Sequence, residues 1–259
     1  MGNLFLMKTI FSKFRIHEVT YLFFLLAFLC GMFKRVFYLF FIVVFHEMGH
    51  VILARLFHYK IVEVVLYPFG GVTRCDHQLN ADSSKDIIIA LGGVFFQFIL
   101  EGFLFLLPFQ DKNIVLFYNQ VLLVFNLLPI IPLDGSVILL HILERFFSFE
   151  FSLKIYEVLS FFALGLFAFY NYFGQIKNYF ICIVLFMEFI LYLKQKKYLI
   201  KRFYLERYLY DFPYKRISNE VGDDYQVLKK GTRHFFYNGK KYETERQILS
   251  KVFDKKGYF

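Results

Sequence analysis

Long apolar blocks separated by short polar segments fill the first three quarters of the chain. Six of them lie near residues 18–33, 36–57, 87–107, 114–133, 152–173 and 178–193. A helix needs about 20 mostly apolar residues to cross the hydrocarbon core of a bilayer, and the blocks approach that length. The pattern therefore predicts an α-helical polytopic membrane protein with about six transmembrane helices.

Residues 61–72 do not follow the helical pattern of the blocks around them. They are apolar and rich in β-branched side chains, and Pro68, Gly70 and Gly71 interrupt their second half. The segment is too short to cross the bilayer as a helix. Extended backbone at membrane depth is tolerated only where protein or a wet cavity surrounds it. Two alternatives therefore stay open, a re-entrant β-hairpin and a surface loop.

The basic residues of the loops predict the orientation, because Lys and Arg are enriched on the cytoplasmic side. With six spans both termini share one side, whose loops carry Lys8, Lys13, Arg15, Arg55, Lys60, Arg74, Lys85, Arg145 and Lys154. The loops of the other side carry only Lys34, Arg35, Lys112 and Lys177. We therefore place both termini in the cytoplasm. The net charge of +9 then follows from topology and a basic tail, and no nucleic-acid partner is needed.

Beyond residue 195 the chain becomes charged and rich in turn residues. Residues 232–237 alternate as in a strand, Asn238-Gly239 is a favoured hairpin turn, and residues 243–253 have helical spacing. We therefore divide the chain into a membrane-embedded domain, 1–195, and a cytoplasmic tail, 196–259, that forms a small α/β module. A module of about 60 residues is marginally stable alone, which favours assembly with a second copy.

The second block contains an HExxH motif, formed by His46, Glu47 and His50. Positions i and i+4 share one face of a helix, so the two histidines can bind one metal ion with Glu47 beside it as a base. Chance would produce this motif about 0.01 times in a chain of this composition. A charged side chain in the middle of a span costs about 2.5–3.5 kcal/mol, which argues against an accident. The alternative is a satisfied polar cluster between helices.

A catalytic zinc ion has three protein ligands and one open position. The candidate for the third ligand is Asp134, which follows Pro129 and Pro132 where these prolines break the fourth block. Broken helices expose backbone groups, which a cavity tolerates. From spacing alone, Asp134 is equally well explained as the cap of a helix beginning near Ser136.

Other acidic residues in apolar surroundings require separate explanations. For Glu101, Glu157 and Glu188 we favour pairing across helices or a position near the interface over metal binding. Glu144 would be the third ligand in a membrane zinc peptidase of another type. His141 follows Asp134 by about two helical turns, and we favour a surface position for it.

The two motifs together resemble the site-2 protease family of intramembrane zinc metalloproteases. HEMGH occupies residues 46–50, and NLLPIIPLDG occupies residues 126–135. The resemblance implies that the zinc ligands are His46, His50 and Asp134. It also implies that Glu47 is the general base and that Asn126 holds the substrate backbone.

The resemblance covers roughly residues 30–145 and is greatest to the sporulation branch, because the chain between the two motifs is too short for an inserted PDZ domain. It implies release of a mother-cell sigma factor from its pro-form, inhibitory membrane-protein partners and a place in the mother-cell membrane around the forespore. Many family members carry cytoplasmic CBS motifs that bind nucleotide and link protomers. The tail has room for about one such motif rather than a pair, which argues against nucleotide binding. Leu91-Gly92-Gly93 departs from the Gly-Pro that is common in the family.

A membrane metal transporter is the alternative from a different functional class. Its histidines and aspartates would form a transit site, with ligands spread along a path across the bilayer. Glu47 argues against this reading, because a base beside the ligands has no evident role in transport. Transport of zinc without peptide cleavage would distinguish the two classes.

Overall fold

The computed structural model describes residues 13–68, 70–76, 78–81, 83–172, 179–214 and 216–254. Lys8 and Lys177, used above for the orientation, lie outside these ranges. The chain forms two compact units, each described separately below. The first unit combines residues 1–77 with 88–127, and the second combines residues 78–87 with 128–259.

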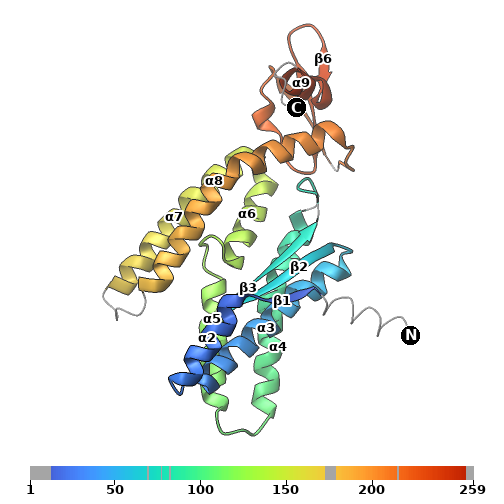
Figure 1. Ribbon diagram of the computed structural model, residues 1–259. Coiled ribbons are helices and arrows are strands. Elements are labelled where there is room, and N and C mark those ends of the chain that lie inside the picture. Colours follow the sequence, from blue (N-terminus) through green and yellow to red (C-terminus); the bar gives the residue numbers. More distant parts are fainter. Residues whose placement is uncertain are drawn as a thin grey trace, which may run out of the picture. The chain divides into compact units, whose positions relative to one another are not determined.

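The first unit joins helices to a small sheet (Figure 1). Its helices are α2 (Glu18–Leu29), α3 (Phe33–Leu56), most of α4 (Ser83–Leu106) and α5 (Lys112–Asn126). Its strands are β1 (Phe14–Ile16), β2 (Lys60–Tyr67) and β3 (Gly70–Asp76), in the order β1-β2-β3. β2 and β3 form an antiparallel hairpin, and β1 pairs in parallel with β2. The described part of residues 61–72 therefore belongs to a β-hairpin, whose re-entrant position stays a prediction.

Two clusters of buried side chains form the core of the first unit. One joins α3, α4 and α5 through Ile42, Leu100 and Val115. The other packs the C-terminal half of α3 on β2 through Val51 and Val64. Between these clusters α3 and α4 come so close that a Cβ on Gly49 would lie 2.2 Å from the carbonyl oxygen of Gly92. Only glycine allows this approach of the two backbones.

Among the described residues, three helices are long and apolar enough to cross a membrane: Phe33–Leu56, Ser83–Leu106 and Phe149–Asn171. They correspond to three of the predicted blocks. α2 is apolar but shorter, and α5 ends at Asn126, before the two prolines of the fourth block. The chain is thus a mostly helical membrane protein, and the count of six spans stays a prediction.

The second unit contains three helices followed by a small α/β arrangement. The helices are α6 (Asp134–Phe146), α7 (Phe149–Tyr172) and α8 (Tyr179–Leu209), and α7 and α8 lie side by side (Figure 1). The rest comprises β4 (Arg216–Val221), the short 3-10 helix η2 (Tyr225–Val227), β5 (Thr232–Tyr237), β6 (Tyr242–Thr244) and α9 (Glu245–Phe253). β5 lies between β4, with which it is parallel, and β6, with which it is antiparallel.

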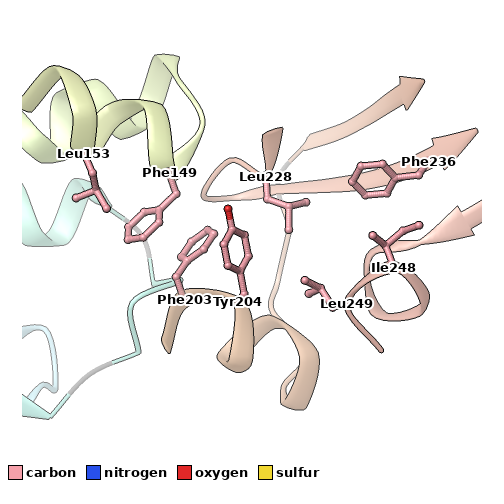
Figure 2. Close-up of a cluster of buried hydrophobic side chains, with 8 residues drawn as sticks. All are labelled: Phe149, Leu153, Phe203, Tyr204, Leu228, Phe236, Ile248 and Leu249. Carbon is pink, nitrogen blue, oxygen red and sulfur yellow. The ribbon is translucent and has the colours of Figure 1, made fainter. Parts of the chain in front are cut away.

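One buried cluster connects the helices of the second unit to its sheet (Figure 2). Phe149 of α7 stacks on Phe203 of α8, with ring centroids 3.9 Å apart. The other members of the cluster are Leu153, Tyr204, Leu228, Phe236, Ile248 and Leu249. α8 continues through residue 195 without a break. The boundary of the two compact units therefore differs from the boundary predicted at residue 195. The assignment of 1–195 to the membrane and 196–259 to the cytoplasm stays a prediction.

Candidate metal centre

The two histidines and the glutamate of the HExxH motif lie on the buried face of α3. His46, Glu47 and His50 are 5%, 5% and 8% exposed, and their candidate ligand atoms lie within 4.8 Å of one another. The Nε2 atoms of the two histidines face each other at 3.1 Å. The helical spacing of i and i+4 thus brings the predicted pair together.

Each histidine has an oxygen acceptor at its other ring nitrogen. Nδ1 of His46 lies 3.0 Å from Oε1 of Gln97, and Nδ1 of His50 lies 2.8 Å from the carbonyl oxygen of Ile89. A neutral imidazole that donates from Nδ1 keeps its lone pair on Nε2, which is the ligand form of histidine. Both lone pairs therefore point into the same space.

The donor set fits zinc. Imidazole nitrogens bind Zn²⁺ at about 2.0–2.1 Å, and a tetrahedral ion holds two of them about 3.3–3.4 Å apart. The observed separation of 3.1 Å between the Nε2 atoms of His46 and His50 is close to this value. The site contains no Cys, and imidazole with carboxylate is a common donor set of catalytic zinc.

Strand β3 lies directly against Glu47. The hydroxyl of Thr73 donates a hydrogen bond of 2.9 Å to Oε2 of this carboxylate. At Gly71 of the same strand, a Cβ would lie 2.5 Å from Cδ of Glu47. The hairpin thus fixes the orientation of the carboxylate beside the two histidines, and a larger residue at position 71 would displace it.

Helix α4 approaches the site from another direction. A Cβ on Gly93 would lie 2.2 Å from Cε1 of His46, so the imidazole ring lies against the backbone of α4. Gly92 makes the close approach to Gly49 described above. The Gly92-Gly93 pair, which departs from the sequence common in the family, is therefore required by the packing of α4 on α3.

Asn126, the last residue of α5, lies beside the site. Its Nδ2 is 3.4 Å from Nε2 of His46. Asp134 is the first residue of α6 and belongs to the second unit. The N-cap position of α6 is occupied by Leu133, whose side chain makes no capping hydrogen bond, and the capping alternative for Asp134 stays open. The role of Asp134 as the third ligand stays a prediction.

Glu144, the alternative third ligand, is engaged in another network. Its Oε2 accepts hydrogen bonds from Ser83 at 3.1 Å, from His141 at 2.7 Å and from Lys230 at 2.8 Å. Burial raises the pKa of Glu144, but the ammonium group of Lys230 and the bond from His141 outweigh it and hold the pKa below its usual range. The carboxylate is thus stabilised by partners that a metal ion would have to replace. His141 is partly buried in this network.

Two of the other acidic residues in apolar blocks have polar partners of their own. Glu157 forms an ion pair with Lys196, with 2.6 Å between Oε2 and Nζ, and Glu101 accepts a hydrogen bond of 2.9 Å from Gln120. Glu188 is exposed on α8. Pairing across helices thus accounts for the first two.

Sequence reasoning missed the residues that surround the motif. Thr73, Gln97 and Asn119 were not selected, although Gln97 and Asn119 are conspicuous as uncharged polar residues inside apolar blocks. Gln97 and Asn119 are both fully buried. An amide in an apolar block is costly unless it has partners, and this signal would have found both.

Comparison with known proteins finds a matching family for part of the chain. Residues 34–112, which include α3 with its motif and α4, match Peptidase family M50. The chain carries a Peptidase family M50 domain. The resemblance to the site-2 protease family is thereby confirmed, and the match supports a zinc metalloendopeptidase.

Two curated relatives extend the similarity beyond the M50 domain. Stage IV sporulation protein FB of Bacillus subtilis is 29% identical over 209 residues, which are 76% of this chain and 71% of that protein. Zinc metalloprotease MJ0392 of Methanocaldococcus jannaschii is 35% identical over 126 residues, 45% of this chain, but only 36% of that protein.

A solved structure supports the fold. The site-2 protease from Methanocaldococcus jannaschii superposes with a TM-score of 0.55 at 22% identity, covering 69% of this chain and 89% of that one. The transporter alternative has no support from these findings, and two candidate ligands, His46 and His50, lie together on α3.

Proposed function

We propose that this protein is an intramembrane metalloprotease that hydrolyses a peptide bond within or beside the bilayer, with zinc held by His46, His50 and Asp134. The observation that carries the proposal is the distance of 3.1 Å between the Nε2 atoms of His46 and His50. The Nδ1 atom of each ring lies beside an oxygen acceptor, which leaves both Nε2 lone pairs for the metal ion. For Asp134 the support is the requirement for a third ligand, the LDG motif and the engagement of Glu144 elsewhere.

When bound, the zinc ion acidifies water and polarises the scissile carbonyl as a Lewis acid. Glu47 accepts the proton of the attacking water and delivers it to the leaving amine. The hydroxyl of Thr73 engages Oε2 of Glu47, so we assign Oε1 as the oxygen that carries the proton. Asn126, beside His46, holds the substrate backbone.

The substrate peptide must be extended before it is cut, because a helical backbone is hydrogen-bonded to itself. β3 is an edge strand of its sheet and contacts Glu47 through Thr73. A peptide added to this edge would be held extended along the base. We therefore propose that the β2–β3 hairpin is re-entrant and receives the substrate.

The substrate class follows from the sporulation relative. We propose that the enzyme releases a sporulation sigma factor from its pro-form and that inhibitory membrane proteins control it. It would act in the mother-cell membrane around the forespore, with six spans and both termini in the cytoplasm. Reporter fusions after Lys13 and at Phe259 test the topology, and a terminus reporting outside would contradict it.

The proposed chemistry separates metal binding from catalysis. In Glu47→Gln we expect about one bound zinc ion per chain and no cleavage of a purified pro-sigma factor, because Glu47 adjoins the ligands without being one. Glu101→Gln is the matched control, since it makes the same change on α4 at a side chain that bonds Gln120. Wild-type turnover of the Glu47 variant would refute the mechanism.

A further inference from the structure

Gln97 is a buried amide at one of the proposed zinc ligands. It lies on α4, is 0% exposed, and its Oε1 is 3.0 Å from Nδ1 of His46. Burying an amide among apolar helices costs free energy unless its polar atoms have partners. The position therefore requires an explanation in terms of the groups that this amide contacts.

Asn119 of α5 fixes which atom of Gln97 faces the histidine. Nε2 of Gln97 lies 3.3 Å from the backbone oxygen of Asn119 and 3.4 Å from its Oδ1, both of which only accept. Nδ2 of Asn119 in turn donates to the backbone oxygen of Gln97 at 3.1 Å. The amino group of Gln97 thus points to Asn119, and its carbonyl oxygen points to His46. Since that oxygen can only accept, Nδ1 of His46 must donate.

The backbone of α4 also restrains the ring of His46. Gly93 precedes Gln97 by one helical turn on the same face of α4, and the ring lies against its backbone. Rotation of the ring about its χ2 angle would bring carbon rather than nitrogen to Gln97 and would break the 3.0 Å bond. Gly93 and Gln97 of α4, with Asn119 of α5, therefore determine the orientation of the His46 ring.

We infer that Gln97, oriented by Asn119, is a positioning residue that keeps His46 in the tautomer with its lone pair on Nε2. This inference rests on the proposed role of His46 as a zinc ligand. Acceptors behind metal-binding histidines change metal affinity by about 10–100-fold when they are removed. Zinc affinity in the absence of substrate is therefore the informative quantity.

The experiment measures zinc affinity of the purified full-length protein by competition with a chelator. Gln97→Met has nearly the same length without an oxygen acceptor, and we expect its affinity to fall about 10–100-fold. Gln97→Glu keeps an oxygen acceptor at Nδ1 of His46 but sets its second oxygen against the two acceptors of Asn119, so we expect a smaller loss of affinity than in Gln97→Met. In Gln97→Asn the side chain is one methylene shorter, so its oxygen moves away from His46, and we expect weaker zinc binding here too. This variant tests the inference should Gln97→Met fail to fold.

Two further variants complete the design. Gln120→Met is the matched control, since Gln120 is exposed on α5 and bonds Glu101 instead. The visible spectrum of the Co²⁺-substituted protein should change in Gln97→Met and not in Gln120→Met. Unchanged zinc affinity in Gln97→Met, or equal losses in the Met and Glu variants, would overturn the inference. Retention of zinc by His46→Ala would instead refute the proposed function.

Discussion

Lys230 forms an ion pair with Glu144, with 2.8 Å between Nζ and Oε2, and the two side chains are only 6% and 1% exposed. The lysine precedes β5, and the glutamate lies on α6, the helix that begins with Asp134. The pair therefore connects the C-terminal part of the chain to the helix of the proposed third ligand.

Removal of this lysine should destabilise the second unit. In Lys230→Met a buried carboxylate loses its cation, and breaking such a pair costs about 3–5 kcal/mol. We expect a lower melting temperature of the purified protein and, because α6 loses an anchor, weaker zinc binding. Lys240→Met, at an exposed position before β6, is the control and should change neither. An unchanged melting temperature in Lys230→Met would show that the pair contributes nothing to stability.

The carboxylate of Glu245 predicts loss of stability in acid. Its Oε1 accepts hydrogen bonds from Nη1 of Arg207 and Nδ1 of His234, both at 3.1 Å, and Oε2 accepts one from Tyr214 at 3.3 Å. Burial raises the pKa of Glu245, but the bonds from His234 and the charge of Arg207 outweigh it and hold the pKa below its usual range.

A group with a depressed pKa stabilises the fold above its unfolded pKa, about 4.3 for Glu, and this contribution is lost as pH falls through the lower folded value. We therefore expect the free energy of unfolding to decline below about pH 4.3. Glu245→Gln should be less stable at neutral pH and should show a shallower decline. Equal slopes for wild type and variant would contradict the assignment.

Asp134 can be tested by removing its charge while keeping its shape. A third ligand that becomes neutral in Asp134→Asn binds zinc less well, so we expect a folded protein with reduced zinc content and no cleavage. Asp111→Asn makes the same change before α5, where the carboxylate pairs with Lys34, and should keep its zinc. Normal zinc content and cleavage in Asp134→Asn would disprove the ligand assignment.

The backbone of α4 predicts that Gly93→Ala disrupts the metal centre. The added methyl would lie 2.2 Å from Cε1 of His46, so the ring must leave its place. Overpacking of this kind costs about 1–3 kcal/mol, and we expect at least a tenfold loss of zinc affinity. Gly102→Ala on the same helix has no atom within 4 Å of its new methyl and should be neutral or stabilising by about 0.5–1 kcal/mol. Equal zinc affinity in the two variants would show that the ring can shift without loss.

The part of the site that could be predicted is the part encoded locally. His46, Glu47 and His50 follow from helical spacing, because one helix brings all three to one face. Gln97 and Thr73 reach the motif from α4 and β3, and no sequence interval specifies such contacts. The packing of Gly49 on Gly92 brings α4 with Gln97 to the motif, and Gly71 allows β3 with Thr73 to approach Glu47. A glycine in an apolar block gives no sign of its partner.

The helices were predictable from their apolar residues, whereas their ends depended on individual residues. The fourth block continues to residue 133 in hydropathy, yet α5 stops at Asn126 because Pro129 and Pro132 cannot continue a helix. At the other extreme, α8 extends to Leu209 although its last turns are charged. Their apolar members, Phe203 and Tyr204, are buried in the cluster of Figure 2, and tertiary packing thus extends the helix beyond its apolar block.

The length of α8 has a mechanical consequence. Its 31 residues form one helix, and at 1.5 Å per residue it measures about 46 Å, while the hydrocarbon core is about 30 Å thick. Were its apolar part to cross the bilayer as the sequence predicts, about 15 Å of the same helix would stand outside, at the end where Phe203 packs with the β4–β6 sheet and α9. The β4–β6 sheet and α9 are thus joined to the apolar part of α8 by a continuous helix and not by a flexible linker. A ligand that rotates the sheet would also rotate the apolar part of α8.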